Sequence, residues 1–460
     1  MKLELKDKRV LVLGLGDTGL SALRWLNRQG ALLSVADTRQ MPPGLALLEV
    51  ELPETKLYLG ALTPQAFEGV DLVVISPGVS LSEPSVQAVI QRGVPVIGDV
   101  ELFAQHRPSG TKLIAITGSN GKSTVTTMVG EMCRASGLKT TVAGNIGLPV
   151  LDTLNGDIPD VYVLELSSFQ LETTSSLNAT AATVLNISED HMDRYHGLKD
   201  YAAAKARIFS GTGVQVLNRQ DSMSLDMTLE GRTCVTFGLD EAKNAEDFGL
   251  GQKDGATILM RGENELITSH ELKISGSHNA ANALAAMALC EVIGLQKEVM
   301  IKALREYKGL PHRVEWVAEI SNITFYDDSK GTNVGATCAA LQGLVGPNDS
   351  NKIVLIAGGD GKGQDFSPLS GIVARNARAV VLIGRDALEI QKGLNVESIH
   401  IVKVETLELA VKAAYDLAQP GDAVLLSPAC ASFDMFRNYV HRAEVFVQSV
   451  KALACQEAAA

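Results

Sequence analysis

Three glycine-rich turns, each directly after a short apolar run, constrain the fold of this chain more than any other feature. They read RVLVLGLGDTG at residues 9–19, TKLIAITGSNGKST at 111–124 and KIVLIAGGDGKG at 352–363. Apolar runs rich in Val, Leu and Ile are typical of buried strands, and segments of helical periodicity come after the turns. Strand, turn and helix in this order predict α/β layers built on parallel sheets.

The chain length and the spacing of these three units predict three domains. A chain of 460 residues is about three times the usual length of a single domain. Pro, Gly and basic residues gather after helical segments at 105–110 and 307–313, which is typical of linkers. Short β-like runs between about 233 and 275 predict a small extra sheet beside the parallel one of the middle domain. We therefore predict domains at residues 1–106, 107–309 and 310–460.

Composition and charge exclude several classes of protein. Hydrophobic residues make up 46% of the chain and charged residues 20%, so disorder, collagen and coiled coil fit poorly. The 41 Lys and Arg against 53 Asp and Glu leave a net charge of −12, which argues against broad binding to nucleic acid or anionic membrane. Six scattered cysteines without a CxxC pair indicate neither a zinc site nor a disulfide framework. Since neither a signal peptide nor a long apolar run occurs, we expect a cytoplasmic protein.

The first glycine-rich turn is a GxGxxG motif that predicts a nucleotide site. Gly14, Gly16 and Gly19 follow a strand, and Asp37 ends the next strand 23 residues after Gly14. Such glycines let the backbone approach a phosphate at a helix N-terminus, while the carboxylate takes a ribose hydroxyl. The motif reports only phosphate and ribose, so it leaves open a nicotinamide or flavin dinucleotide and any other nucleotide-bearing ligand. A tight strand-to-helix turn without a ligand is the structural alternative.

The second turn, TGSNGKST, predicts ATP binding. Lys122, Ser123 and Thr124 lie at a predicted helix start, where backbone amides cradle the β- and γ-phosphates. The lysine reaches these phosphates and a hydroxyl ligates Mg²⁺. The turn departs from the full Walker pattern because Ile116 occupies the position five before Gly121. A solvated glycine-rich turn is the alternative interpretation.

Acidic and imidazole side chains follow the next two apolar strands. Glu165 ends the run VYVLE, and Asp190, His191 and Asp193 come shortly after the run ATVLN. These groups at strand ends suit a magnesium–nucleotide site, although a single histidine is also a common core or surface residue. Lys205 lies on a predicted helix among alanines, where its spacing alone indicates a solvated charge.

Further polar clusters lie in the later part of the chain. His278, Asn279 and Asn282 open a predicted helix and either bind a nucleotide or cap that helix. Arg313 follows the second linker and is the kind of fixed charge that phosphate clamps use. A last group of side chains gathers at predicted strand ends of the third domain, which suits a small dicarboxylate or amino acid. These residues are Asp327, Asp328, Ser329, Lys330, Thr332, Lys362, Ser427, Ser432 and Phe433.

In their order along the whole chain, these motifs closely resemble those of the ATP-dependent Mur ligases. The motifs are TGSNGKST, ELSSFQLE, NISEDHMDRY, SGSHNAANALAA, HRVE, DDSKGTN, GGDGKG and SPACASFD. The N-terminal GLGDTG and the tripeptides at 37–39 and 76–78 are most similar to members that join D-glutamate to UDP-N-acetylmuramoyl-L-alanine. The resemblance implies a Rossmann-like UDP-binding domain, a P-loop ATPase-like domain and a C-terminal Rossmann-like domain. It also implies that the first nucleotide is UDP and not a dinucleotide.

The same resemblance implies an amide-forming reaction of cytoplasmic peptidoglycan precursor synthesis. ATP would phosphorylate the carboxylate of UDP-N-acetylmuramoyl-L-alanine, and the amine of D-glutamate would attack the acyl phosphate. A tetrahedral intermediate would then expel phosphate, which serves as leaving group because a free carboxylate is a poor electrophile. We expect a monomer that uses ATP and Mg²⁺.

The resemblance further implies roles for individual residues. Lys122, His191 and Lys205 would be catalytic. Magnesium would be held by Ser123, Glu165, His191 and Lys205, the last as a carbamate in place of a solvated charge. ATP would contact Gly118, Asn120, Gly121, Lys122, Ser123, Thr124, Asn279, Asn282, Arg313 and Asp328. The UDP precursor would contact Gly16, Asp17, Thr18, Asp37, Thr38, Arg39, Ser76, Pro77, Gly78 and Asn145. D-Glutamate would contact Lys330, Thr332, Lys362, Ser432, Phe433 and also Tyr439.

Other interpretations are weaker but stay open. The loop after His191 reads RYHGLKDY, one residue shorter than the common form, which puts the register of Lys205 in question. A related ligase could add a different amino acid, and folylpolyglutamate synthase shares the ATP motifs, although the GLGDTG domain argues against it. A nucleotide-binding regulator would not require Lys122, Glu165, His191 and Lys205 together. A dehydrogenase that uses the GxGxxG motif is the remaining alternative.

Overall fold

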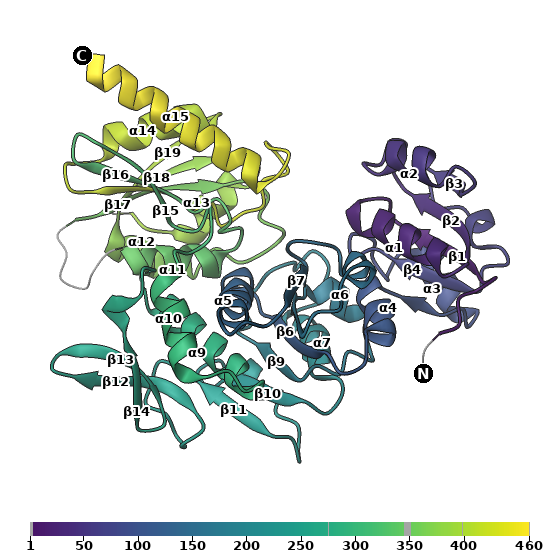
Figure 1. Cartoon of the computed structure of the whole chain (residues 1–460). Coiled ribbons are helices and arrows are strands. Elements are labelled where there is room, and N and C mark those ends of the chain that lie inside the picture. The colour runs from purple at the N-terminus through teal and green to yellow at the C-terminus, as the bar shows by residue number, and fades with distance from the viewer. Residues whose placement is uncertain (1–2, 275, 345–350, 398, 460) are drawn as a thin grey trace. The chain divides into compact units, whose positions relative to one another are not determined.

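The computed structural model describes residues 3–274, 276–344, 351–397 and 399–459 (Figure 1). Its chain divides into two compact units. The first contains Met1–Asn186, Lys199–Ile267 and Asn282–Leu304, and the second contains Ile187–Leu198, Thr268–Ala281 and Arg305–Ala460. Among the residues that the structure describes, no helix is long and apolar enough to cross a membrane.

The first unit begins with a five-stranded parallel sheet of order β3-β2-β1-β4-β5. Its strands are β1 (Arg9–Leu13), β2 (Leu32–Asp37), β3 (Lys56–Leu59), β4 (Leu72–Ile75) and β5 (Val96–Ile97). The helices of this region are α1 (Asp17–Arg28), α2 (Leu45–Glu51), η1 (Pro64–Phe67), α3 (Pro84–Gln91) and α4 (Asp99–His106). The strand order reverses between β1 and β4, so the loops after these strands border the crevice where open α/β sheets bind ligands.

The second sheet of the first unit has nine strands in the order β14-β13-β12-β11-β10-β9-β6-β8-β7. These are β6 (Lys112–Thr117), β7 (Thr140–Gly144), β8 (Val161–Glu165), β9 (Ala181–Val184), β10 (Val214–Asn218), β11 (Cys234–Phe237), β12 (Phe248–Lys253), β13 (Ala256–Arg261) and β14 (Asn264–Thr268). The central strand β6 is fully buried from Leu113 to Ile116, as expected of a parallel strand that is covered on both faces.

Helical segments lie between these strands and after the last of them. They are α5 (Lys122–Ala135), η2 (Val150–Asn155), α6 (Ser168–Glu172), α7 (Leu198–Ala206), η3 (Arg207–Phe209), α8 (Ser222–Leu225), η4 (Ser269–Glu271), α9 (Ser277–Val292) and α10 (Lys297–Glu306). The helix α5 begins at the lysine of the TGSNGKST turn, as the sequence predicts.

The predicted extra strands exist, but they do not form a separate sheet. The strand β11 pairs in parallel with β10, and β12 joins β11 through the single pair Phe237 and Phe248 before it turns back against β13. Backbone hydrogen bonds therefore extend the main sheet through a narrow junction. The small extra sheet expected beside the parallel one is therefore a continuation of its edge, a detail that short apolar runs do not reveal because they do not show which edge they pair with.

The second unit carries a six-stranded sheet of order β15-β16-β20-β17-β18-β19, in which only the β15–β16 pair is antiparallel. Its strands are β15 (Glu315–Ile320), β16 (Ile323–Asp327), β17 (Ile353–Gly358), β18 (Ala377–Ile383), β19 (His400–Lys403) and β20 (Ala423–Leu426). Its helices are α11 (Val334–Leu344), α12 (Leu369–Asn376), α13 (Ala387–Leu394), α14 (Leu407–Leu417) and α15 (Tyr439–Ala459).

Alternate residues of β17 build two cores on opposite faces of this sheet. Ile353 and Leu355 pack in one core with residues of α11, α12 and α13, while Val354 and Ile356 pack in the other with residues of α14 and α15. This arrangement confirms the predicted α/β class, with mostly parallel sheets.

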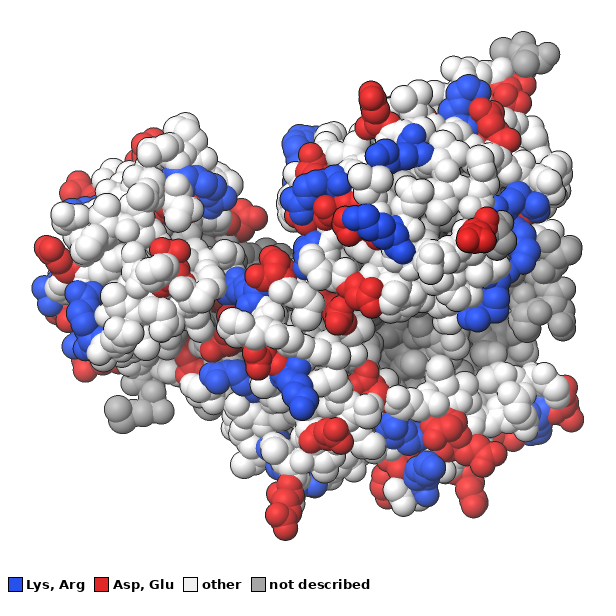
Figure 2. Space-filling model, turned by 180° about the vertical axis from the view of Figure 1, so that it is seen from behind, with Lys and Arg blue, Asp and Glu red and all other residues white. Residues whose placement is uncertain are grey.

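Charges of both signs are interspersed over the surface drawn in Figure 2. Among the described residues of that face, Lys and Arg form no broad positively charged area. This distribution agrees with the net charge of −12.

Candidate active site

The carboxyl edge of the five-stranded sheet borders a cavity of about 610 Å³. Every residue predicted to contact the UDP precursor lines it. These residues are Gly16, Asp17, Thr18, Asp37, Thr38, Arg39, Ser76, Pro77, Gly78 and Asn145. The first nine lie at the carboxyl ends of β1, β2 and β4, in the loops after these strands and in the first turn of α1, and Asn145 follows β7 of the other sheet. The geometry thus brings together residues that lie far apart in the sequence.

The glycines of the GxGxxG turn have distinct physical reasons to be glycine. Gly14 has a φ of +88°, a conformation that L-residues rarely adopt. A Cβ atom on Gly19 would lie 1.9 Å from the carbonyl oxygen of Gly14, so α1 can approach β1 only without a side chain there. A Cβ atom on Gly16 would meet nothing within 4 Å, because this glycine faces the open cavity.

Asp37 is buried at the end of β2 and fixes the guanidinium of Arg39. Its carboxylate oxygens accept hydrogen bonds from the Arg39 Nε at 2.8 Å, the Arg39 Nη2 at 2.7 Å and the Leu15 amide at 2.7 Å. Burial alone would raise the pKa of Asp37, but these hydrogen bonds outweigh it and lower the pKa to about 2. The carboxylate therefore stays ionised and holds the guanidinium of Arg39 at the cavity. This role is additional to the ribose contact that the sequence predicts for Asp37.

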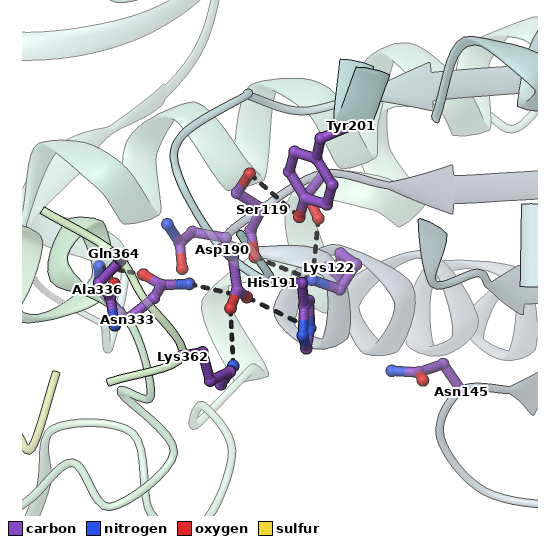
Figure 3. Close-up of polar contacts among 12 residues, drawn as sticks. Ser119, Lys122, Asn145, Asp190, His191, Tyr201, Asn333, Ala336, Lys362 and Gln364 are labelled. Atoms are coloured by element: carbon purple, nitrogen blue, oxygen red, sulfur yellow. Dashed lines mark hydrogen bonds and ion pairs between the residues drawn. The ribbon is translucent and has the colours of Figure 1, made fainter. Parts of the chain in front are cut away.

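The TGSNGKST turn wraps around the N-terminus of α5. Lys122 Nζ donates to the carbonyl oxygens of Gly118 at 2.8 Å and Ser119 at 2.9 Å, which holds the ammonium over the turn (Figure 3). The amide of Asn120 donates to the Asn186 side chain at 2.8 Å, and this bond anchors the turn to the end of β9. A helix N-terminus with a lysine above it is a phosphate-binding arrangement.

Glu165 at the end of β8 has one oxygen that suits a metal ion. Its Oε1 accepts a hydrogen bond from Asn145 Nδ2 at 2.7 Å, but its buried Oε2 has no hydrogen-bond partner among the described residues. An unsatisfied buried carboxylate oxygen is costly, and carboxylate oxygen is a preferred ligand of Mg²⁺. The Oε2 atom of Glu165 therefore has the chemistry of a magnesium ligand.

Lys205 is buried, with 1% of its surface exposed, so the solvated charge that its helical spacing indicates was wrong. Its Nζ donates to the Gly118 carbonyl oxygen at 2.9 Å and lies 4.6 Å from the centre of the Tyr201 ring. Sequence spacing missed this burial because α7 lays this face against the phosphate-binding turn. Lys205 therefore reaches Gly118 although the loop after His191 is one residue shorter than the common form.

In the second unit, the loop 187–198 contacts the turn after β17. Asp190 Oδ1 lies 2.6 Å from Lys362 Nζ, and Asp190 Oδ2 accepts a hydrogen bond from Asn333 Nδ2 at 3.4 Å (Figure 3). His191 has a φ of +60°, and its Nε2 lies 3.7 Å from Asp190 Oδ2. The structure thus joins Asp190 to Lys362, a contact that the motifs did not predict.

A cavity of about 680 Å³ in the second unit contains part of the predicted nucleotide set. Asn279 and Arg313 line it, together with Trp316, which is 60% exposed. Trp316 ends the HRVEW segment, and the sequence motifs assign it no role. Its exposed ring beside Lys273, Lys308 and Arg313 is a surface on which a nucleotide base can stack. Asn282 belongs to the first unit, where its Oδ1 lies 2.5 Å from the ideal Cβ position of Gly121.

Asp328 is buried at the end of β16 and does not line this cavity. Burial raises its pKa to about 7, although the hydroxyl of Ser427 donates to its Oδ2 at 2.6 Å and lowers the pKa in part. A buried carboxyl group with so strongly raised a pKa is found at functional sites and also in structural networks such as this pair with Ser427.

The residues predicted to contact the amino acid follow three neighbouring strands, β16, β20 and β17. The three loops are held together by backbone hydrogen bonds from Ala429 to Gly331 and in both directions between Asp360 and Ala431. Lys330 Nζ lies 5.3 Å from the centre of the Tyr439 ring, while Phe433 is 74% exposed. The loops therefore share one edge of the sheet, where Phe433 stays exposed.

Arg442, on α15, is a residue of this edge that the sequence analysis missed. It is fully buried and donates to the hydroxyl and carbonyl oxygens of Ser329 at 3.0 and 2.7 Å and to the Cys430 carbonyl oxygen at 3.1 Å. It thus ties the loop after β16 to the loop after β20. A charged residue on a helix is usually solvated, so no local signal points to this role.

A glycine-rich turn at a helix N-terminus, a carboxylate suited to magnesium, and lysines and hydroxyls along one sheet edge of a second α/β unit are typical of a nucleotide-dependent multidomain enzyme. Three family models match the chain: the MurD-like N-terminal domain of Mur ligases at residues 8–98, the Mur ligase middle domain at 116–290 and the glutamate ligase domain at 312–430. The chain belongs to the Mur ligase family, whose members are ATP-dependent ligases that form amide bonds.

Curated relatives cover the whole chain at high identity. The UDP-N-acetylmuramoylalanine–D-glutamate ligase of Methylobacillus flagellatus is 62% identical over 100% of both chains. The ligase of the same name from Thiobacillus denitrificans is 56% identical over 99% of this chain and 98% of its own.

Solved structures show the same fold at low identity. The UDP-N-acetylmuramate–alanine ligase MurC of Thermotoga maritima is 20% identical, with a TM-score of 0.58 over 96% of this chain and 99% of its own. MurF of Acinetobacter baumannii is 17% identical, with a TM-score of 0.62 over 96% of this chain and 93% of its own.

Proposed function

We propose that this enzyme joins D-glutamate to UDP-N-acetylmuramoyl-L-alanine, with conversion of ATP to ADP and phosphate, in cytoplasmic peptidoglycan precursor synthesis. The observation that carries the proposal is full-length identity of 62% to a ligase that is named for this reaction. The proposed enzyme is a monomer organised as domains 1–106, 107–309 and 310–460.

The cavity of the five-stranded sheet is the proposed site for the UDP precursor. Its loops offer backbone amides and hydroxyls, and Arg39 is held at its wall by Asp37. Asn145 lines the same cavity and bonds to Glu165, so the far end of the precursor would reach the phosphate-binding turn. This arrangement suits a long ligand whose carboxylate must meet the γ-phosphate of ATP.

Lys122 and the amides of the TGSNGKST turn would bind the phosphates of ATP. When Lys122 exchanges the carbonyl oxygens of Gly118 and Ser119 for the γ-phosphoryl group, it stabilises the charge that grows there during transfer. Mg²⁺ bound there would neutralise phosphate charge, and Ser123, Glu165 and His191 would hold it. Asn279, Asn282, Arg313 and Asp328 would contact the rest of the nucleotide.

Lys205 is the proposed site of a carbamate. Carbamylation replaces the ammonium by an anion and so supplies a further oxygen ligand for Mg²⁺. The position of the Lys205 nitrogen beside Gly118 supports this role, because it lies at the phosphate-binding turn.

The acceptor amino acid would bind at the loops after β16, β17 and β20. Lys330, Thr332 and Lys362 would take its carboxylates with Ser432, and Phe433 and Tyr439 would border it. The amine would then attack the acyl phosphate, and the site must exclude water because an exposed acyl phosphate hydrolyses.

The test is phosphate release with ATP, Mg²⁺ and UDP-N-acetylmuramoyl-L-alanine, compared across several acceptors. We expect release to depend on D-glutamate and not on L-glutamate, L-lysine, diaminopimelate or D-alanyl-D-alanine. Turnover with another acceptor would reassign the amino-acid site but keep the ligase chemistry. No turnover with any acceptor would contradict the proposed precursor.

A further inference from the structure

We propose that Glu101 is a positioning residue for the UDP precursor. Its carboxylate holds the loop 173–176, and through this loop it keeps Gln170 at the wall of the cavity of the five-stranded sheet. The effect falls on the N-acetylmuramoyl-L-alanine end of the precursor and not on its UDP end. This inference rests on the proposed function, and it adds a residue that the sequence motifs do not contain.

Glu101 lies on α4, the helix that connects the two sheets of the first unit. The strand β5 ends at Ile97 and β6 begins at Lys112, and the family models of the N-terminal and middle domains leave α4 between them. The helix contacts α6 (Figure 1), and the ring of Phe103 packs edge-on against Tyr162 of β8, with the ring centroids 5.0 Å apart. This packing fixes α4 against the strand that leads into α6.

The Glu101 carboxylate binds two successive backbone amides of the loop 173–176. Its Oε2 accepts hydrogen bonds from the amides of Ser175 at 2.6 Å and Ser176 at 3.0 Å, and its Oε1 accepts from the Ser176 hydroxyl at 2.6 Å and Gln105 Nε2 at 2.8 Å. Burial alone would raise the pKa of Glu101, but these hydrogen bonds outweigh it and lower the pKa. The carboxylate therefore stays ionised, and hydrogen bonds to an ionised acceptor are stronger than neutral ones.

Two further contacts fix the same loop. The Gly98 amide donates to the Thr173 carbonyl oxygen at 3.4 Å, and a Cβ atom on Gly98 would lie 2.4 Å from Thr173 Oγ1, so only glycine permits this approach. From η3, Arg207 donates through Nε and Nη2 to the Thr174 carbonyl oxygen at 3.1 and 2.8 Å. The loop is thus held both from α4 and from η3, and Glu101 supplies the acceptor for its last two amides.

The loop 173–176 sets the position of Gln170. Thr174 Oγ1 donates to the Gln170 carbonyl oxygen at 2.7 Å. At the start of α6, the Ser167 amide donates to Gln170 Oε1 at 3.0 Å, and the Gln170 amide donates to Ser167 Oγ at 3.2 Å. Because α6 has only five residues, it is too short to be stable by itself, and its position depends on the loop that Glu101 holds.

The cavity of the five-stranded sheet has lining residues from both sheets. Gly144, Asn145 and Gln170 follow strands of the nine-stranded sheet or end one, and the other lining residues lie between positions 13 and 79. Asn145 bonds to Glu165, and in the proposed function the reacting end of the precursor lies on this side. Loss of the Glu101 contacts therefore reduces the fraction of molecules in which Gln170 fits that end, and the apparent affinity falls by the same fraction.

The test is Glu101→Leu, which removes both acceptor oxygens. Isothermal titration of the full chain measures the dissociation constants of UDP and of UDP-N-acetylmuramoyl-L-alanine, and the ADP-forming assay measures the KM for ATP. We expect the dissociation constant of the precursor to rise about 10-fold, while that of UDP and the KM for ATP stay within about twofold. Glu101→Gln keeps one acceptor oxygen and should give a rise of about threefold for the precursor alone, so it provides the test if Glu101→Leu does not fold.

Asp247→Leu is the matched control, because it also removes a buried carboxylate that accepts from a backbone amide. Asp247 Oδ1 accepts from the Thr236 amide at 2.7 Å, and its Oδ2 accepts from Asn244 Nδ2 at 2.8 Å. It lies between β11 and β12, whereas β7, which precedes Asn145, lies beyond β6 at the edge of the sheet. In this variant the free energy of unfolding should fall, and the ratio of the two dissociation constants should keep its wild-type value.

Each other result overturns the inference. Equal weakening of UDP and the precursor by Glu101→Leu would mean that Glu101 serves the fold of the whole cavity. An unchanged dissociation constant of the precursor would mean that α6 needs no support from Glu101, and the same change of ratio in Asp247→Leu would mean a general effect of lost stability. If the wild-type enzyme does not bind UDP-N-acetylmuramoyl-L-alanine, the proposed function fails instead, and this outcome is visible before any variant is compared.

Discussion

The phosphate-binding turn of the first unit and the amino-acid edge of the second are both glycine-rich turns after a buried strand, yet they are built differently. Residues 117–124 place backbone amides, Lys122 and Ser123 around one helix N-terminus within a single short segment. The amino-acid edge needs three loops that follow β16, β17 and β20 and are tied together by Arg442. A site within one segment can be recognised from its sequence motif. A site built from several loops depends on tertiary contacts between residues far apart in the chain.

The sharpest test of the contiguous site is Lys122→Met. We expect ADP formation to fall about 10³-fold, because the substitution removes a positive charge from the transferring phosphoryl group. The free energy of unfolding should change little, since the two hydrogen bonds from Lys122 Nζ to Gly118 and Ser119 stay within the turn itself. Lys139→Met, at an exposed lysine after α5, should keep full activity. A large loss of stability in Lys122→Met would contradict the view that Lys122 serves the site and not the fold.

Lys205→Ala tests whether the turn also depends on a residue from another helix. We expect activity to fall about 10²-fold or more, and acetate to restore part of it by filling the place of the carbamate. Steady-state rates over a series of acetate concentrations measure the rescue. Lys199→Ala, at an exposed lysine of the same helix, should need no rescue. Unchanged activity of Lys205→Ala would contradict the metal role of this residue.

Arg442→Met tests the assembled site. The substitution removes three hydrogen bonds and takes the donor away from the carbonyl oxygens of Ser329 and Cys430, so we expect the free energy of unfolding to fall by about 3 kcal/mol. The KM for D-glutamate should rise more than the KM for UDP-N-acetylmuramoyl-L-alanine. Chemical denaturation and steady-state kinetics check the two parts. The matched change Arg437→Met, at an exposed arginine, should leave both at wild-type values, and an equal result for the two variants would refute the role of Arg442.

The pH dependence of stability should have opposite signs at two buried carboxyl groups, Asp37 in the first unit and Asp328 in the second. The raised pKa of Asp328, about 7, means that its contribution is present below pH 4 and is lost as the pH rises to about 7. The lowered pKa of Asp37, about 2, means that its contribution is present above pH 4 and is lost as the pH falls towards 2.

Denaturation at several pH values, with Asp328→Asn and Asp37→Asn compared with the wild type, measures these contributions. Each substitution should remove a slope of about 1 kcal/mol per pH unit within its own window. Slopes of the same sign would show that the two carboxyl groups do not differ as the structure indicates.

Much of the fold followed from local patterns. The apolar runs predicted the central strands, and the glycine-rich turns predicted where α1 and α5 begin, because these patterns act over a few residues. The strands β11 to β14 were expected as well, but not their union with the main sheet, since strand pairing depends on an edge that lies elsewhere in the chain.

The sequence by itself determined the α/β class and the glycine-rich turns, because spacing and residue type carry that information, and its resemblance to the Mur ligases pointed to the residues that line the cavity of the five-stranded sheet. Only the tertiary structure decided that Lys205 is buried at Gly118, that Arg442 ties two loops together and that Asp190 pairs with Lys362. The physical reason is that burial and ion pairing arise from contacts between segments far apart in the chain. In the sequence, a charged residue that will be buried cannot be told from one that will be solvated.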